Sequence, residues 1–331
     1  MDETLRVKVG DPVGGWNPGE ERGPERLRRT RSAAMKSLRK AGCDQVLSIV
    51  RTPWGDFCCR AGRIDGSIRG VAVHFTILGS GSGGNCAYLE AGETRLLIDA
   101  GFSARQIRER LASIGRTPEG LTGILVTHEH GDHIKGLGVL AEKTGTRIYA
   151  NRFTHEAIRR EFPGVRFEAA TFETGATFAL GEVEVRTFSV PHDAADPVGF
   201  LLATPAGNIG FLTDLGHATK LILERVRPAH LLVLEANYDV KLLQEDTRRP
   251  WSTKQRIASR HGHLSNHAAS EVATAVVHDG LRRIYLGHLS RDCNTPELAR
   301  QTVGAALDGI GARHVVLENT SQDVPCPTVS L

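Results

Sequence analysis

The sequence predicts an αββα sandwich, in which two β-sheets pack face to face and helices cover both outer surfaces. Two observations carry this prediction. From Val71 onward, short β-rich segments alternate with segments of helical periodicity, and the strands gather between groups of helices. The 331 residues are 40% hydrophobic and 24% charged, which suffices for one large globular core or two ordinary ones. The sequence has no internal repeat of the length that solenoids and propellers use.

Residues 1–70 differ in composition from the rest of the chain. They hold 14 Lys and Arg against 9 Asp and Glu, whereas the remaining residues hold 27 against 29. The Gly, Pro, Arg and Glu in residues 10–32 favour disorder. We therefore expect residues 1–70 to be a basic, largely disordered extension, with a nucleic-acid-binding arm as the alternative, and residues 71–331 to be the folded domain.

The first half of this domain alternates between strands and helices. Runs rich in β-branched and aromatic residues, bounded by turn residues, predict strands at 71–80, 86–92, 94–101, 121–127 and 147–150. Helical spacing predicts helices at 103–115, 136–144 and 152–161. In the first of these helices, Ile107 and Leu111 share one face and Gly115 gives a stop signal.

The second half begins with strands only and then returns to alternation. The strands are expected at 165–170, 176–190, 198–205, 208–213, 230–237, 282–288 and 313–319. The helices are expected at 218–226, 266–278 and 296–309. Asn294, Thr295 and Pro296 read as the start of the last helix, because proline favours the first helical position.

A glycine-rich stretch at 79–84 fits the G-x-G-x-x-G pattern of a dinucleotide-binding loop. The pattern requires a helix directly after it, whose N-terminus receives the pyrophosphate. The following residues NCAYLEAG read as a strand, so we reject the nucleotide interpretation. The loop remains either a tight turn or a binding loop for phosphate oxygens, with Ser80, Ser82 and Asn85 as the candidate contacts.

The stretch THEHGDH at 127–133 holds three histidines, a glutamate and an aspartate directly after an expected strand. His128, His130 and Asp132 stand two residues apart, and His133 follows directly. This spacing allows His128 and His130 to face one ion while Asp132 and His133 reach a second. Imidazole and carboxylate groups are suitable ligands for divalent metals of the zinc type. Two ions need more ligands than these four, so the interpretation predicts others downstream.

Further polar residues stand where later strands end. His192 follows a strand at a proline turn, Asp214 ends FLTD, and His288 ends YLGH. Asp99 ends LLID, just before the first helix. Ligands that come from several strand ends meet on one edge of a rigid sheet, as a metal site requires. The sequence therefore predicts a site for two ions, in which the carboxylate of Asp214 could bridge them.

These residues carry a resemblance to the metallo-β-lactamase superfamily, in which HxHxDH is followed by strand-end His, Asp and His. More narrowly, the chain resembles the bacterial YycJ/WalJ-type hydrolases, which are regarded as DNA exonucleases. The segments that carry this closer resemblance are LGSGSGGNCAYLE, LLIDAG, VTHEHGDHIKGLGVL, LEANYD, HGHLSNHAA and LGHLSRDCNTPELA. The resemblance covers about residues 73–320.

The resemblance implies a metallo-β-lactamase-type αββα fold and a division of the ligands. His128, His130 and His192 would hold one metal, and Asp132, His133 and His288 the other, with Asp214 between them. Asp99 would orient ligands from outside the site. Two ions, zinc or manganese, would neutralise a phosphodiester and hold a hydroxide between them at neutral pH. We expect a DNA exonuclease of 5′-to-3′ polarity, for which the resemblance also implies a role in DNA mismatch repair.

Other residues are candidates for proton transfer and for substrate contact. Asp132 could guide a proton of the attacking hydroxide, and His263 could donate one to the leaving oxygen. Asn266 is expected either to cap the following helix or to touch phosphate. The stretch 247–270 has five Lys and Arg, including Arg256, and neither Asp nor Glu. It is either a track for a nucleic-acid backbone or a solvated loop.

The sequence also limits the other possibilities. No run of about 18 apolar residues is present, so we expect no membrane span. The six cysteines, of which Cys58 and Cys59 are adjacent and the others scattered, favour a reduced, cytoplasmic protein. A small-molecule hydrolase that cleaves a thioester, lactam or cyclic phosphodiester is the main alternative to the nuclease. A third alternative is a binding protein that has lost catalysis, although no expected ligand is missing. Protein partners and the oligomeric state stay open.

Overall fold

The computed structural model describes residues 47–51, 57–61 and 71–331, and the chain divides into two units, Met1–Arg69 and Gly70–Leu331. In the first unit, strands β1 (Leu47–Arg51) and β2 (Phe57–Ala61) pair antiparallel. The sequence predicts neither strand. The disorder expected in residues 10–32 lies outside the described residues. None of the helices in the described part combines the length and hydropathy needed to cross a membrane.

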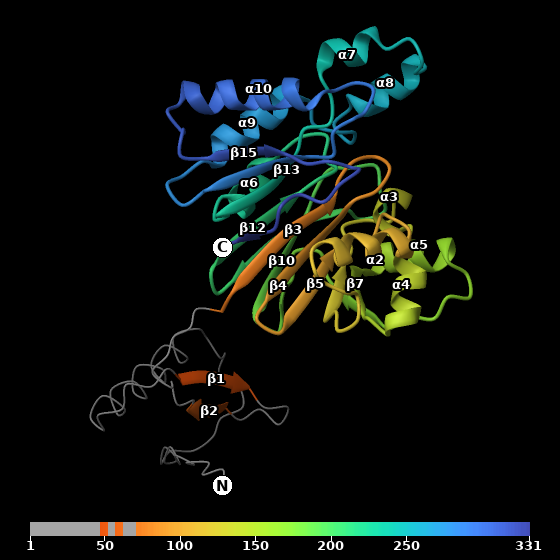
Figure 1. The fold of residues 1–331 in the computed structure, drawn as a ribbon, viewed down its shortest axis with the longest axis vertical. Helices are drawn as coiled ribbons and strands as arrows, with labels where there is room; N and C mark the ends of the chain where they lie inside the picture. Colours follow the sequence, from red (N-terminus) through yellow and green to blue (C-terminus); the bar gives the residue numbers. More distant parts are fainter. Residues whose placement is uncertain (1–46, 52–56, 62–70) are drawn as a thin grey trace, which may run out of the picture. The chain divides into compact units, whose positions relative to one another are not determined.

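Two seven-stranded sheets form the centre of the second unit (Figure 1). The first sheet has the order β16 (Val329–Ser330), β3 (Val73–Gly79), β4 (Cys86–Ala91), β5 (Thr94–Ile98), β6 (Gly123–Leu125), β7 (Ile148–Asn151) and β8 (Ala169–Phe172). The second has the order β15 (Val316–Asn319), β14 (Arg283–Gly287), β13 (Leu231–Glu235), β12 (Gly207–Leu212), β11 (Val198–Thr204), β10 (Val183–Ser189) and β9 (Thr177–Leu180). Strands β5 to β8 run parallel, as do β12 to β15.

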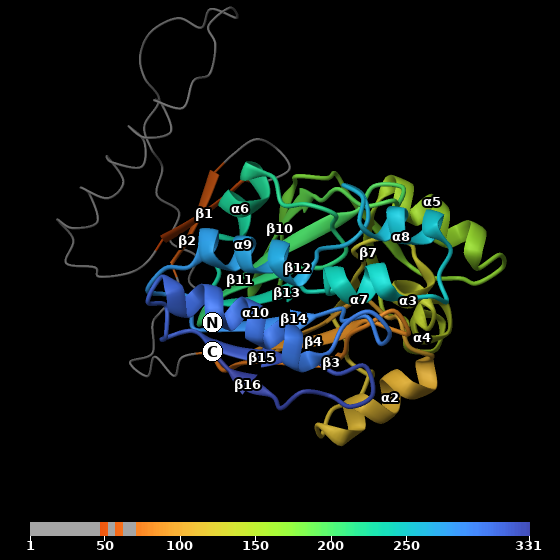
Figure 2. The same cartoon turned by 90° about the horizontal axis from the view of Figure 1, so that it is seen from above.

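Helices cover the outer face of each sheet, on opposite sides of the sandwich (Figures 1 and 2). The first sheet carries α2 (Ala104–Ser113), α3 (Gly131–Ile134), α4 (Leu137–Thr144) and α5 (Arg152–Glu161). The second carries α6 (Lys220–Val226), α9 (Asn266–Val276) and α10 (Pro296–Gly309). Two short helices, α7 (Val240–Glu245) and α8 (Trp251–Ile257), lie between β13 and α9 in the chain. The αββα prediction is confirmed.

The packing of the buried side chains follows from the period of two along each strand. In β5, Leu96 and Ile98 join the apolar layer between the sheets, whereas Leu97 joins the layer under α2, α4 and α5. In β13, Leu232 likewise faces the helices while Val233 faces the opposite sheet. Because both faces of these strands are covered, their sequences are continuous apolar runs. This makes them rigid supports for whatever follows their ends.

Several expected boundaries were wrong. The strand expected at 165–170 is β8 at Ala169–Phe172, and the run at 176–190 divides into β9 and β10 at Gly181, where φ is +54°. Helices α7 and α8 were missed because α7 buries only Leu243 and α8 buries no side chain, so neither shows apolar periodicity.

The cap of α9 is Ser265, whose side chain accepts from Ala268 N, and not Asn266. The expected start of α10 is confirmed, with Thr295 as its cap and Pro296 in its first turn.

A candidate metal centre at the carboxyl ends of the strands

The structure brings together all seven metal ligands that the sequence predicts. His128 and His130 lie between β6 and α3, Asp132 and His133 lie in α3, and the other three follow β10, β12 and β14 within three residues. Donor atoms lie within 4.8 Å of one another in each of three sets: His128, His130 and His192; His128, His133 and Asp214; and Asp132, His133 and His288. Parallel strands present their carboxyl ends at one edge of a sheet, which explains how residues far apart in sequence converge here.

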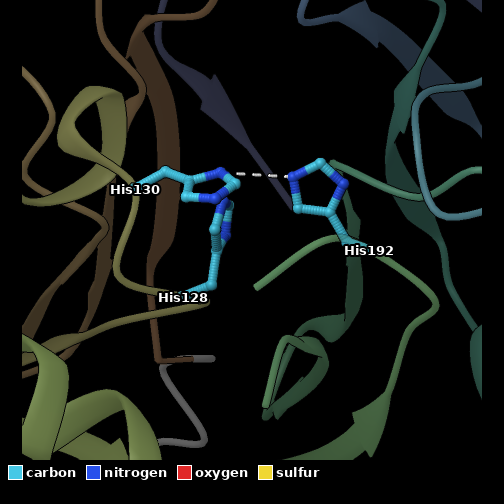
Figure 3. A group of neighbouring side chains, drawn as sticks. All are labelled: His128, His130 and His192. Carbon is cyan, nitrogen blue, oxygen red and sulfur yellow. Dashed lines mark hydrogen bonds between the residues drawn. The ribbon is translucent and has the colours of Figure 1, made fainter. Parts of the chain in front are cut away.

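The first set consists of three histidine rings (Figure 3). Nε2 of His192 lies 3.3 Å from Nδ1 of His130, and Nδ1 of His192 donates to the carbonyl of Gly262 at 3.0 Å. A carbonyl only accepts, so the lone pair of His192 is on Nε2, which faces the other rings. Burial lowers the pKa of His128 well below its usual value, and its Nε2 is buried with no hydrogen-bond partner. Neutral rings with converging lone pairs are the form that binds metal.

In the other two sets, His133 and His288 face the carboxylates of Asp214 and Asp132. His133 donates from Nδ1 to Asp99 at 2.7 Å, which leaves its Nε2 facing Asp214 Oδ2 at 3.1 Å. His288 places Nδ1 3.1 Å from Glu235 and Nε2 3.3 Å from Asp132 Oδ2. Both rings therefore turn Nε2 inward, each fixed from behind by a buried carboxylate.

Asp214 belongs to the set of His128 and His133 and also lies near residues of the other two sets. Its Oδ2 is 3.1 Å from His133 and has no hydrogen-bond partner, and its Oδ1 is 3.5 Å from His288 and 3.8 Å from His192. Burial would raise the pKa of Asp214, but His288 and His133 hold it well below its usual range. Burial would likewise lower the pKa of His133, but Asp214, Asp99 and Asp132 raise it well above. Imidazole nitrogens and carboxylate oxygens therefore converge on one buried space, and divalent cations fit this donor set.

Glu235, the residue that ends β13, is a part of the site that the sequence interpretation missed. It is fully buried, and Oε1 accepts from Nδ1 of His263 at 2.7 Å and lies near Nδ1 of His288. Oε2 accepts from the backbone N–H groups of Leu215 and Leu264 at 2.9 and 3.2 Å. The signal that could have identified it is the same as for Asp214 and His288, a polar residue at the end of an apolar strand.

The backbone at three strand ends adopts an unusual conformation. Asp99, Asp214 and His288 have φ values of 60°, 55° and 55°, and they are the non-glycine residues with positive φ in the described chain. Such a conformation costs on the order of 1–3 kcal/mol and persists where the surroundings fix it. Here it turns the chain sharply as it leaves the sheet, so that the side chain points into the site.

His263 lies beside the metal ligands. Its Nδ1 is 3.6 Å from Asp214 Oδ1, its ring stacks on His288 with 5.2 Å between centroids, and its side chain is 19% exposed. Burial would lower the pKa of His263, but the Glu235 carboxylate raises it above the usual value. With Nδ1 donated to Glu235, Nε2 is the nitrogen left to face a substrate.

The residues expected to contact substrate have different surroundings. Ser80 donates to Asn85 and accepts from His288 N, and Asn85 donates to Asp132 Oδ2 at 3.2 Å, so both support ligands. Ser82 is exposed. Asn266 is buried and exchanges two hydrogen bonds of 2.9 Å with Asn294.

The cations of the 247–270 stretch are partly compensated by carboxylates from other parts of the chain. Arg248 and Arg249 pair with Asp246 and Asp292. Arg256 pairs with Asp193, the residue after the ligand His192. Part of the stretch is therefore the helix α8, linked to the site through Arg256, and not a loop.

Comparisons with known proteins agree with this geometry. The β-lactamase superfamily domain matches residues 94–289. The chain is 37% identical over 268 residues to the exodeoxyribonuclease WalJ of Streptococcus pneumoniae, covering 79% of this chain and 99% of that protein. It is 38% identical over 242 residues to the exodeoxyribonuclease YycJ of Bacillus anthracis, covering 73% and 91%. The metallo-β-lactamase fold protein YhfI from Bacillus subtilis superposes with a TM-score of 0.59 at 14% identity, covering 77% and 99%. The chain belongs to the β-lactamase superfamily and has the metallo-β-lactamase fold.

Proposed function

We propose that this protein is a metal-dependent nuclease that removes nucleotides from an end of DNA, in the 5′-to-3′ direction. The observation that carries the proposal is the convergence of seven ligands beside the buried Glu235–His263 pair. Two relatives whose names state exodeoxyribonuclease activity support it, because the match spans 99% and 91% of their lengths. We further propose that residues 71–331 form the hydrolase domain.

In this proposal the three histidines of the first set would hold one ion, Asp132, His133 and His288 would hold a second, and Asp214 would contribute to both. Bound zinc or manganese would supply Lewis-acid chemistry, neutralising phosphate charge and lowering the pKa of a water molecule. Asp99 and Glu235 keep His133 and His288 in the tautomer whose Nε2 faces inward.

Two side chains handle protons. The carboxylate of Asp132 is 22% exposed, so it is open to solvent and is placed to guide a proton of the attacking water. His263 Nε2 gives a proton to the sugar oxygen that leaves phosphorus, and Glu235 stabilises the charged ring before this transfer. Ser82 and Arg256 are the exposed candidates for phosphate contacts, whereas Ser80, Asn85 and Asn266 act through the residues that they hold in place.

The proposal includes a cytoplasmic location and a role in DNA repair. The cysteines at 86, 293 and 326 are free and buried, as in proteins of reducing compartments.

The test is digestion of end-labelled duplex DNA, single-stranded DNA and RNA by purified protein in Mn²⁺ or Zn²⁺. Stepwise shortening of DNA from its 5′ end is expected, with loss of activity in Asp132→Ala. Asp279→Ala, an exposed carboxylate outside the site, is the matched control and is expected to retain activity. Intact polymers together with turnover of a thioester, lactam or cyclic phosphodiester would instead establish the small-molecule hydrolase.

A further inference from the structure

The chain leaves the metal centre after β13 and returns to it before α9, and the residues between, 239–262, form what we term the α7–α8 arm. Both ends of the arm are fixed at the site. Asn237, just before it, donates to the carbonyl of His288 at 2.8 Å, and Gly262 at its end accepts from His192. Lys254 of α8 donates to the carbonyl of Gln244 in α7. Figures 1 and 2 show α8 at the same end of the sandwich as α3, which carries Asp132 and His133.

Helix α8 has one exposed face, and that face leads to the metal ligands. Its exposed residues are Trp251, Ser252, Gln255 and Arg256, a spacing that places them on one side of a helix. Arg256 at the inner end contacts Asp193, directly after His192. Trp251 at the outer end lies five residues away, about 7.5 Å along the helix axis at ~1.5 Å per residue.

Trp251 is exposed more than any other large hydrophobic side chain in the described part of the chain, at 67%. A single exposed apolar residue needs no explanation in itself. This one stands in a stretch with five Lys and Arg and no acid, although Arg248, Arg249 and Arg256 pair with carboxylates outside it. Arg260 in the same stretch donates to the His217 ring, and none of its described contacts is with a carboxylate. An exposed aromatic ring among cations is the arrangement that binds single-stranded nucleic acid.

We propose that Trp251 stacks on an unpaired base of the substrate and that the exposed face of α8 guides a single-stranded end to the metal centre. The inference rests on the proposed nuclease function and adds to it the strandedness of the substrate near the site. Inside a duplex both faces of each base are covered by neighbouring bases, so the ring can stack only on an unpaired or terminal base. Arg260, which has no carboxylate among its described contacts, would follow the backbone by charge complementarity.

The test measures binding without catalysis. Fluorescence anisotropy of a fluorescein-labelled oligo-dT is recorded with the full chain in EDTA, for the wild type, Trp251→Ala and Trp251→Phe. Loss of one stacked base predicts binding about 5- to 150-fold weaker for Trp251→Ala, with most of the affinity kept by Trp251→Phe. Ile310→Ala, at the exposed end of α10, is the matched control and should bind as the wild type does. A blunt duplex of equal length should show a much smaller effect.

An abasic scan locates the contact. Removing the base that stacks on Trp251 should weaken binding by the wild type and leave binding by Trp251→Ala unchanged. Equal affinity of the wild type and Trp251→Ala for oligo-dT would overturn the inference while the nuclease proposal stands. A wild type that binds no nucleic acid would overturn both. Loss of self-association in Trp251→Ala, with unchanged affinity for oligo-dT, would show that the ring contacts a second copy of this chain and would also overturn the inference.

Discussion

Glu235 accepts a hydrogen bond from Nδ1 of His263 at 2.7 Å, and its other oxygen accepts from two backbone N–H groups. A glutamine at this position would place its NH₂ group against donors in either orientation, facing Leu215 N and Leu264 N or facing the two rings. We expect Glu235→Gln to lower metal affinity and nuclease rate by about 10- to 100-fold. Calorimetric titration with Mn²⁺ measures the metal affinity, and digestion of end-labelled DNA measures the nuclease rate. Glu168→Gln, an exposed carboxylate paired with Arg147, should change neither quantity.

Metal removal is expected to destabilise the protein. Buried acceptors such as Asp214 Oδ2 and His128 Nε2 lack partners in the described structure, so a bound cation would stabilise the folded state specifically. At about 100 times Kd, added Mn²⁺ or Zn²⁺ should raise the free energy of unfolding by about 2.7 kcal/mol. Differential scanning fluorimetry of chelator-treated protein checks this through the shift in Tm. His128→Ala should lose the response, and the exposed His267→Ala should keep it; an unshifted Tm in the wild type would count against the site.

Gly101 makes room for the metal-binding segment. A Cβ at this position would overlap the carbonyl oxygen of Asp132, which accepts from Asn85 N at 2.8 Å. We expect Gly101→Ala to lower the free energy of unfolding by at least about 2 kcal/mol and to displace Asp132. Gly131→Ala, in the same segment, meets no atom within 4 Å and should be neutral or slightly stabilising. Urea unfolding of the metal-free proteins compares them, and equal midpoints for the two variants would contradict this account.

His155 provides a pH dependence that is separate from the metal centre. It is buried in α5, donates from Nε2 to the carbonyl of Ala170, and burial lowers its pKa. The unfolded chain therefore binds a proton at a higher pH than the folded chain does. The contribution of neutral His155 to the free energy of unfolding is therefore present above about pH 6.5, the usual pKa of histidine. It falls as the pH decreases below that value. His155→Gln keeps a donor for Ala170 and does not titrate, so its free energy of unfolding should vary less between pH 5 and 7.5. Urea unfolding of both proteins in EDTA tests this, and parallel pH profiles would refute it.

The sequence was sufficient for the fold, and it predicted seven candidate ligands that the structure brings together, because one physical rule governs both. Strands covered on both faces are continuous apolar runs, and a polar side chain at the end of such a run is conspicuous, as His288 is after β14. Glu235 follows the same rule and was still missed, because the pattern of HxHxDH followed by strand-end His, Asp and His contains no glutamate at this strand end. Helix α8 gave no signal since it buries nothing. The internal hydrogen bonds of Ser80 and Asn85 depend on contacts across more than 40 residues, which local spacing does not encode.

Each set of donor atoms draws on both sheets of the sandwich. His128, His130, Asp132 and His133 extend from the first sheet, whereas His192, Asp214 and His288 extend from the second. Neither half of the chain has enough donors to hold two ions alone, so metal binding and the docking of the two sheets are thermodynamically linked. Bound ions would therefore stabilise the interface between the two sheets. A change that increases metal affinity would also strengthen the association of the sheets, and separation of the sheets would release the metal.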